Sequence, residues 1–371
     1  MLLTHLAAAQ PADSLRVAAL LSQGETHLFF ARYDPALSAY GAAANLAREH
    51  FPAMYIDALN GAAGSHIANA RYGPAWVLLD RLRQAIDSLG LGDHPGHALA
   101  LFLEGKCAAE MADYDLAREK LAAALAMYQR LGSKASPEQA ACIVWQGACY
   151  RRRGDFEQAK IYGQRALDMY RQAGEDKHPG VADALNNIGY ACMSQDDCLA
   201  ATAYYEQSLV LRRQLFGENH PDVAESLQNI ATCLNRQGEP EKALELLYHS
   251  LAIKQKTLSA DHYALSYAYS NIGVIHHQRR EFDLSLKYAL KGMRVMQKNF
   301  GEYHPALVAT YNNLATRHGM AGEYAPARVY LQKGLMSIAE DFRDTRFYAN
   351  PSPGSIRYEP FVFNFLYSKA I

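Results

Sequence analysis

Hydrophobic and small residues recur every three or four positions along most of the chain, which is the spacing of a buried stripe on an α-helix. In the segment 181–193 these positions are Val181, Leu185, Ile188, Gly189 and Cys192. A polar break follows at 194–197, and a second helical pattern then runs to about residue 211. The link 216–221 places Gly after this helix and Pro in the first turn of the next one. The pattern predicts pairs of antiparallel helices joined by short turns.

The helical pairs repeat with a step of 42 residues. One series of histidines lies at multiples of this step, and Pro follows four of its five members: His94, His178, His220, His262 and His304. Small residues within the first helix keep the same register: Gly105, Gly147, Gly189, Ala231, Gly273 and Ala315. A pair of helices cannot bury its apolar faces alone, so neighbouring pairs must stack.

These residues resemble a known family. A small residue in the first helix, Gly-x-aromatic turns at 154–156 and 322–324 and an Ala-rich second helix are similar to the tetratricopeptide repeat. The 42-residue step, with His178-Pro-Gly-Val-Ala and Leu185-Asn-Asn-Ile, resembles the kinesin light chain subtype of that repeat. The resemblance implies an all-α fold, a right-handed α-solenoid of about eight TPR-type helix-turn-helix repeats with a concave groove.

The repeat register divides the chain into three expected parts. They are an N-terminal extension over 1–13, a solenoid over 14–341 with two degenerate repeats over 14–90 and six regular repeats over 94–341, and a tail over 342–371. The tail contains three Pro and the aromatic run 361–367. It has three possible roles: it caps the last repeat, folds into the groove as an internal ligand, or pairs with a second chain. Capping is favoured, because terminal repeats need a cover.

Composition and motifs narrow the function. The 371 residues carry a net charge of -1, which argues against nucleic acid as a partner. No apolar run is long enough for a membrane span, and the opening segment lacks a basic region, so we expect a cytoplasmic protein. Cys107, Cys149 and Cys233, like the histidine series, occur one per repeat, which favours core packing and helix capping over a metal site or disulfides. No motif for nucleophilic or nucleotide chemistry is present, so we expect neither an enzyme nor a cofactor.

A series of asparagines is the sharpest candidate for a binding site: Asn187, Asn229, Asn271 and Asn313. Each precedes a buried Ile or Leu and therefore lies on the flank of the first helix. In the resembled family this helix lines the groove and this Asn contacts the backbone of a bound extended peptide. A carboxamide offers both a donor and an acceptor, which suits a peptide unit of any sequence. The alternative is that these side chains bond neighbouring repeats and hold the superhelix.

Other residues share the stripe of these asparagines, among them Tyr190, Arg236 and Gln278. In the fourth and third repeats, Trp145 and Leu103 take the position of the asparagine. This predicts an apolar side-chain pocket beside the series of asparagines. Ordinary packing between repeats is an equal alternative for Trp145. Arg152 either complements a helix C-terminus or binds an acidic peptide, and a solvated surface is the better interpretation of Arg151 and Arg153.

The sequence thus predicts a non-enzymatic adaptor or scaffold that binds a protein or peptide partner in a concave groove. Two alternatives remain open. One is a regulatory module that responds to a small ligand or signal peptide, and the other is a structural assembly protein that forms a homo-oligomer through the solenoid or tail.

Overall fold

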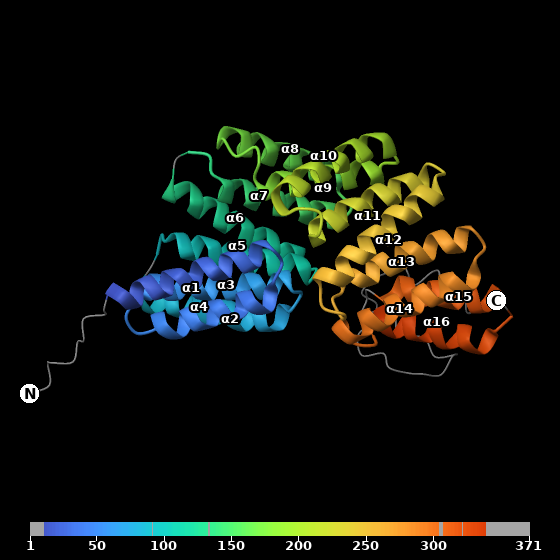
Figure 1. Cartoon of the computed structure of the whole chain (residues 1–371), viewed down its shortest axis with the longest axis horizontal. Helices are drawn as coiled ribbons and strands as arrows, with labels where there is room; N and C mark the ends of the chain where they lie inside the picture. The colour runs from blue at the N-terminus through green and yellow to red at the C-terminus, as the bar shows by residue number, and fades with distance from the viewer. Residues whose placement is uncertain (1–10, 91, 133, 304–306, 321, 339–371) are drawn as a thin grey trace, which may run out of the picture. The chain divides into compact units, whose positions relative to one another are not determined.

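The computed structural model describes residues 11–90, 92–132, 134–303, 307–320 and 322–338. Within these ranges the chain forms sixteen α-helices and no β-strand, which confirms the all-α prediction. The predicted tail, most of the N-terminal extension, and His304 with Pro305 lie outside the described residues. The helices, coloured in chain order in Figure 1, are α1 (Pro11–Phe29), α2 (Tyr33–Ala47), α3 (Pro52–Ala68), α4 (Tyr72–Ser88), α5 (Pro95–Glu110), α6 (Tyr114–Leu131), α7 (Pro137–Arg152), α8 (Phe156–Gln172), α9 (Pro179–Ser194), α10 (Cys198–Phe216), α11 (Pro221–Arg236), α12 (Pro240–Thr257), α13 (Ala264–Gln278), α14 (Phe282–Phe300), α15 (Val308–Met320) and α16 (Tyr324–Ile338).

Successive helices are joined in pairs by turns that share one backbone geometry. Each turn places one residue at positive φ, and after the first interval these residues follow the 42-residue step: Ala31, Ala70, Ala112, Gly154, Asp196, Gly238, Arg280 and Gly322. Positive φ costs little at Gly154, whose φ is 82°, because glycine has no Cβ. The sequence repeat and the backbone repeat therefore share one register.

Histidines of the 42-residue series cap the first helices α5, α9 and α11, as predicted. The Nδ1 atoms of His94 and His178 each accept a hydrogen bond of 3.0 Å from the backbone N–H two residues later. His220 accepts the equivalent bond at 3.2 Å, and Ser136 caps the helix of the unit that lacks a histidine. These bonds satisfy backbone N–H groups that have no partner inside the helix.

The small residues inside the first helices allow the two helices of a pair to pack closely. A Cβ on Gly105 would lie 2.7 Å from Leu121 Cγ, and one on Gly189 would lie 2.8 Å from the Tyr205 ring.

All six cysteines are free; Cys198 is half-buried and the other five are buried. Burial raises the pKa of Cys149 to about 11, so this thiol stays protonated in the core. These observations confirm the structural interpretation of the cysteines.

The chain divides into two compact units, residues 1–239 and 240–371, each of which is described by itself. Unit 1 contains α1 to α11, and unit 2 contains α12 to α16. In unit 1 the first helices of successive pairs contact one another, whereas the second helices of successive pairs make at most isolated contacts. The first helices α5, α7, α9 and α11 therefore lie on the inner side of the curved stack.

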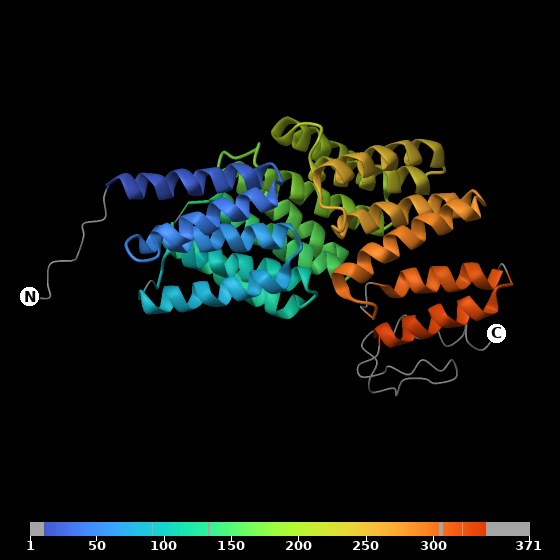
Figure 2. The same ribbon diagram turned by 60° about the horizontal axis from the view of Figure 1, so that its bottom comes forward.

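The curvature of unit 1 brings its first hairpin to its last helices. The Phe29 and Phe216 rings lie 5.0 Å apart, and Phe216 stacks on His220 with centroids 4.2 Å apart. His220 Nε2 lies 3.2 Å from the carbonyl oxygen of Phe29, 191 residues earlier in the chain. Since His220 Nδ1 accepts the capping bond, Nε2 carries the proton and donates to that carbonyl. We call this group (Phe29, Phe216 and His220) the closing contact; the end of α1 and the α10–α11 link also lie side by side in Figures 1 and 2.

Candidate functional site

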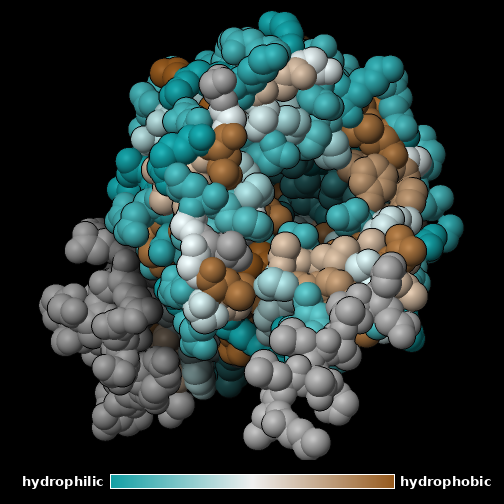
Figure 3. Space-filling view, turned by 90° about the vertical axis from the view of Figure 1, so that its left-hand side faces the viewer, coloured by the Kyte–Doolittle hydropathy of each residue, from teal (hydrophilic) through white to brown (hydrophobic). Residues whose placement is uncertain are grey.

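The inner face of unit 1 is the stripe of side chains that α5, α7, α9 and α11 present to the concave side. A hollow opens on the side of the molecule that carries the N-terminal helices, and hydrophilic residues dominate its depth (Figure 3). The predicted site residues of these helices are buried or half-buried, except Arg236, which is exposed. Their contacts decide which of them remain available to a ligand.

One set of inner-face contacts forms a ladder between repeats. In each rung a side chain bonds to a residue 43 positions earlier, one repeat and one residue back. Asn187 Nδ2 donates to the Val144 carbonyl at 3.2 Å, and Asn229 Nδ2 donates to Asn186 Oδ1 at 2.7 Å. The corresponding arginine rungs run from Arg152 to the Ala109 carbonyl at 2.6 Å and from Arg236 to the Met193 carbonyl at 2.8 Å. The ladder thus gives the predicted asparagines a structural role in unit 1.

The ladder uses these two asparagines to different extents. Asn187 is only 6% exposed, and its Oδ1 also accepts a hydrogen bond of 3.1 Å from Arg151 Nε. Asn229 is half-buried, and its Oδ1 has no hydrogen-bond partner among the described residues. The interpretation as a link between repeats therefore fits Asn187, while Asn229 retains an acceptor for a ligand.

Arg151 is the side chain whose environment differs most from the sequence-based expectation. Its guanidinium lies 4.6 Å from the centre of the Tyr190 ring and is fixed by the bond to Asn187. No carboxylate in the described part of the chain forms an ion pair with it. Burial, and then the charge of Arg152, lower the pKa of Arg151. The expected solvated position is thus wrong for Arg151: it is a half-buried cation with no ion pair to another described residue, and the more distant charge of Glu225 only partly opposes the lowering of its pKa.

Two further cations lie close to the Trp145 ring. Lys106 Nζ lies 5.0 Å from the ring centre and Arg152 Cζ lies 6.0 Å from it. Arg152 is paired with Glu110 at 2.7 Å, whereas Lys106 has no ion pair among the described residues. We call Lys106, Trp145, Arg151, Arg152 and Tyr190 the basic-aromatic cluster.

The predicted pocket between Trp145 and Leu103 requires a correction. Leu103 is 6% exposed and belongs to the core cluster that α5 shares with α3. Its Cδ2 lies 3.7 Å from the place that a Cβ on Gly64 would take, so a small residue in the preceding repeat makes room for it. Trp145 instead packs against a second cluster that includes Ala108 and Cys149. Leu103 is therefore a core residue and does not line a ligand surface.

The acidic residues of the stripe serve another cation. Arg212 of α10 is buried, and its guanidinium lies 2.8 Å from Asp183 Oδ1 and 3.0 Å from Glu225 Oε2. Burial alone would lower the pKa of Arg212, but Glu225, Asp222 and Asp183 raise it above its ordinary value. This group joins α9, α10 and α11, and its carboxylates Asp183 and Glu225 form their ion pairs with Arg212.

The equivalent stripe in unit 2 has a different character. Asn271 is half-buried and Asn313 is exposed, and neither side chain has a hydrogen bond to another described residue. Around them Tyr267, Val274 and Met320 are 50%, 44% and 71% exposed, and Gln278 is exposed. We call these six residues of α13 and α15 the neutral face, because none of them is charged.

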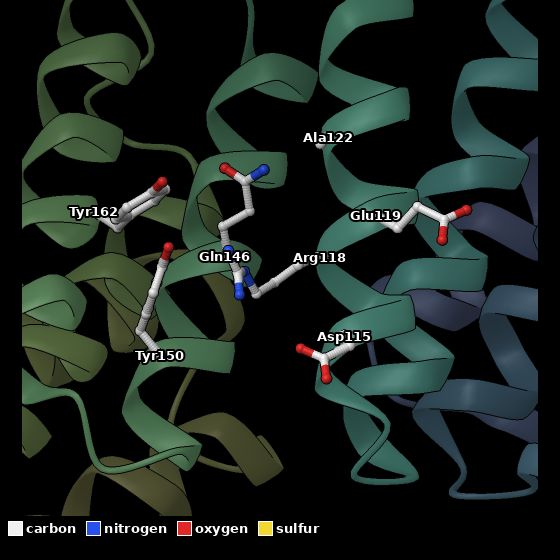
Figure 4. Close-up of a pocket in the computed structure, with 7 residues that line it drawn as sticks. All are labelled: Asp115, Arg118, Glu119, Ala122, Gln146, Tyr150 and Tyr162. Carbon is white, nitrogen blue, oxygen red and sulfur yellow. The ribbon is translucent and has the colours of Figure 1, made fainter.

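A separate cavity of about 430 Å³ lies on the outer side of unit 1, where α6, α7 and α8 leave a gap between the second helices. Figure 4 shows Gln146, Tyr150 and Tyr162 on one side and the acidic and basic residues of α6 on the other. Arg118 lies 5.1 Å from the Tyr150 ring, which in turn lies 4.9 Å from the Tyr162 ring. Burial and the hydrogen bond to Tyr162 raise the pKa of Tyr150. Sequence reasoning missed this cavity, which requires the splayed second helices.

A signal in the sequence could have identified Arg151. Side chains in this fold also bond across 36 positions: Arg151 reaches Asn187, and Asn60 donates to the Gly96 carbonyl at 3.0 Å. Pairing residues at this offset would have placed Arg151 against the asparagine stripe.

In the ranges that the structure covers, no group of side chains is arranged to hold a metal ion. None of the helices described here has the length and apolar character of a membrane span.

Comparisons with known proteins agree with this fold. A sequence model described as tetratricopeptide repeat matches residues 139–209, 180–256 and 264–335, whereas no curated protein matches the chain. The structure of the Rap conjugation gene regulator of plasmid pLS20 in complex with the Phr* peptide is 12% identical, with a TM-score of 0.63 over 86% of this chain and 94% of that chain. A Rap protein complexed with competence and sporulation factor is 13% identical, with a TM-score of 0.60 over 86% and 97%. A putative kinesin light chain of Podosopora anserina is 17% identical, with a TM-score of 0.42 over 54% and 94%. At such identities the first two likenesses concern the fold, and they confirm an α-solenoid.

Proposed function

Because the chain belongs to the tetratricopeptide repeat family, we propose that it is a non-enzymatic, cytoplasmic adaptor that binds an extended peptide on the inner face of unit 1. The peptide carries an acidic residue, whose carboxylate lies against the basic-aromatic cluster. The observation that carries this proposal is the half-buried guanidinium of Arg151, which lies on Tyr190 and forms no ion pair within the described part of the chain.

An unpaired cation inside a protein is energetically costly. Removing a charge from water is unfavourable unless another group compensates it. Asn187 and the Tyr190 ring compensate Arg151 in part, since one bond uses Nε and the ring contributes a cation–π contact. The two terminal amino groups of the guanidinium remain for a ligand, and a carboxylate fits their fork in bidentate fashion.

Neighbouring residues supply the rest of the site. The ammonium group of Lys106 adds a second positive charge beside Trp145. Asn229 Oδ1 accepts from a peptide N–H, which anchors the main chain whatever its side chains. Fold relatives support a peptide ligand, since one of the two Rap structures was solved with the Phr* peptide.

A selection from displayed linear peptides tests the proposal. The full chain is the bait, and the selected peptides should be enriched in Asp and Glu. Their affinity is then measured by fluorescence anisotropy for the wild type, Arg151→Met and the matched control Arg153→Met. Arg153 lies two residues after Arg151 and is more exposed. It forms an ion pair of 2.8 Å with Asp115, which is not part of the basic-aromatic cluster.

The expected result is a loss of about tenfold or more for Arg151→Met, since a hydrogen bond to a charged group contributes about 1.5–3 kcal/mol. Arg153→Met should bind like the wild type. Equal affinity of the two variants, or selected peptides without acidic residues, would contradict the proposal.

A further inference from the structure

The neutral face of unit 2 exposes three large apolar side chains. Tyr267 and Val274 of α13 and Met320 of α15 are all exposed, with Met320 the most open of the three. Exposed apolar side chains beside polar ones are a feature of surfaces that bind another segment. The carboxamides of Asn271, Asn313 and Gln278 supply the polar edge.

The chemistry of the neutral face selects its occupant. It carries no charge, so it offers nothing to the acidic peptide proposed for unit 1. Its free carboxamides offer donors and acceptors that match an extended main chain, and its apolar groups match aromatic side chains. The suitable occupant is therefore an uncharged, aromatic, extended segment.

The chain itself contains such a segment close by in sequence. Residues 361–367 read Phe-Val-Phe-Asn-Phe-Leu-Tyr and include no charged residue. They follow α16, which ends at Ile338, so the connection belongs to unit 2. The intervening residues extend to about 75 Å at most, whereas a helix of the length of α13 measures about 22 Å. The connection is therefore about three times as long as α13, which gives the segment a long reach within unit 2.

We propose that residues 361–367 of this chain bind the neutral face of unit 2, with their aromatic side chains on Tyr267, Val274 and Met320 and their main chain on the carboxamides. A tethered segment acts at an effective concentration of the order of millimolar. Any other ligand of this face must displace it, so the segment acts as an internal competitor. This proposal concerns a different surface from the acidic-peptide site, and either can fail without the other.

Cysteine cross-linking in the full chain tests the position of the segment. Asn364→Cys is combined with Met320→Cys, and in the control with Val329→Cys on α16, which is exposed but outside the neutral face. The protein is oxidised at low concentration, and the products are identified by mass spectrometry. The 320–364 disulfide should form within one chain at least tenfold faster than the 329–364 disulfide. Equal rates, or cross-links mainly between chains, would overturn the proposal.

A labelled peptide that spans residues 359–369 gives a second test. The full chain with Phe361→Ser, Phe363→Ser and Phe365→Ser has lost its own competitor, so it should bind this peptide at least tenfold more tightly than the wild type. Adding Met320→Glu should remove that binding, while adding Val329→Glu should leave it intact. Peptide binding that is the same in the wild type and the triple variant, or that is insensitive to Met320→Glu, would overturn the proposal.

Discussion

The inner faces of the two units carry asparagine at the same repeat position, but its contacts differ. In unit 1, Asn187 is buried and bonded to both Val144 and Arg151. In unit 2, Asn313 is exposed, and no hydrogen bond joins it to Ser270, the residue 43 positions earlier. A position in a repeat therefore fixes where a side chain lies on its helix, while the preceding repeat decides whether that side chain is free.

The charges of the two faces differ in the same way. Unit 1 places Lys106, Arg151 and Arg152 around two aromatic rings. The neutral face of unit 2 has exposed apolar groups and free carboxamides instead. The two proposed ligands follow from this contrast: an acidic peptide for unit 1 and an uncharged aromatic segment for unit 2. The comparison predicts that equivalent substitutions will have unequal effects in the two units.

The largest difference is expected for the apolar members of the stripe. Leu103→Ala should lower the free energy of unfolding by about 2–5 kcal/mol, because it leaves a cavity between α5 and α3. Val274→Ala, on the exposed neutral face, should change it by about 0.5 kcal/mol or less. Urea denaturation followed by circular dichroism measures both. A small effect of Leu103→Ala would indicate that Leu103 faces the groove and not the core.

A smaller difference is expected for the asparagines. Asn187→Ala removes the partner of the Val144 carbonyl and of Arg151 Nε, so it should lower the free energy of unfolding by about 1–3 kcal/mol. Asn271→Ala breaks no hydrogen bond to another described residue and should be nearly neutral for stability. The same denaturation experiment applies. If both substitutions cost equally little, the ladder does not stabilise unit 1.

The fold was predictable from the sequence because two periods act together. The helical spacing defines each helix, and the 42-residue step places the turns, so even the capping role of His178 could be inferred before its bond to the Gly180 N–H was seen. Both periods are properties of the chain alone, and neither depends on which rotamer a side chain adopts.

The site was less predictable because it depends on contacts between repeats. Leu103 shares the register of Asn187, but Gly64 in the preceding repeat leaves space for it in the core. Arg151 lies off the asparagine stripe of its own helix, yet it reaches the stripe of the next one through Asn187. The pattern within a single helix contains no information on contacts between repeats, so it predicts the wrong environment for both residues.

The smallest effect concerns the closing contact of unit 1 and its dependence on pH. His220 stacks on Phe216, caps α11 through Nδ1 and donates to the Phe29 carbonyl, so the neutral form is the one that fits. Burial lowers the pKa of His220, while Asp222 and the bond to Phe29 oppose this and Arg212 reinforces it. The folded state therefore binds the proton less well than the unfolded state.

The sign of the pH effect follows by linkage. Above the unfolded pKa of about 6.5 the contribution of neutral His220 is fully present, and it is lost as the pH falls below that value toward the lowered folded pKa. His220→Asn keeps a capping side chain and removes the titration. We expect the free energy of unfolding of the wild type to fall more than that of His220→Asn between pH 7 and pH 5. At pH 7, Phe216→Ala should lower the free energy of unfolding by about 0.5–1.5 kcal/mol, because the ring contacts are lost. Parallel pH profiles for the wild type and His220→Asn would show that protonation of His220 does not control the closing contact, and the contrast between the units would then rest on their inner faces alone.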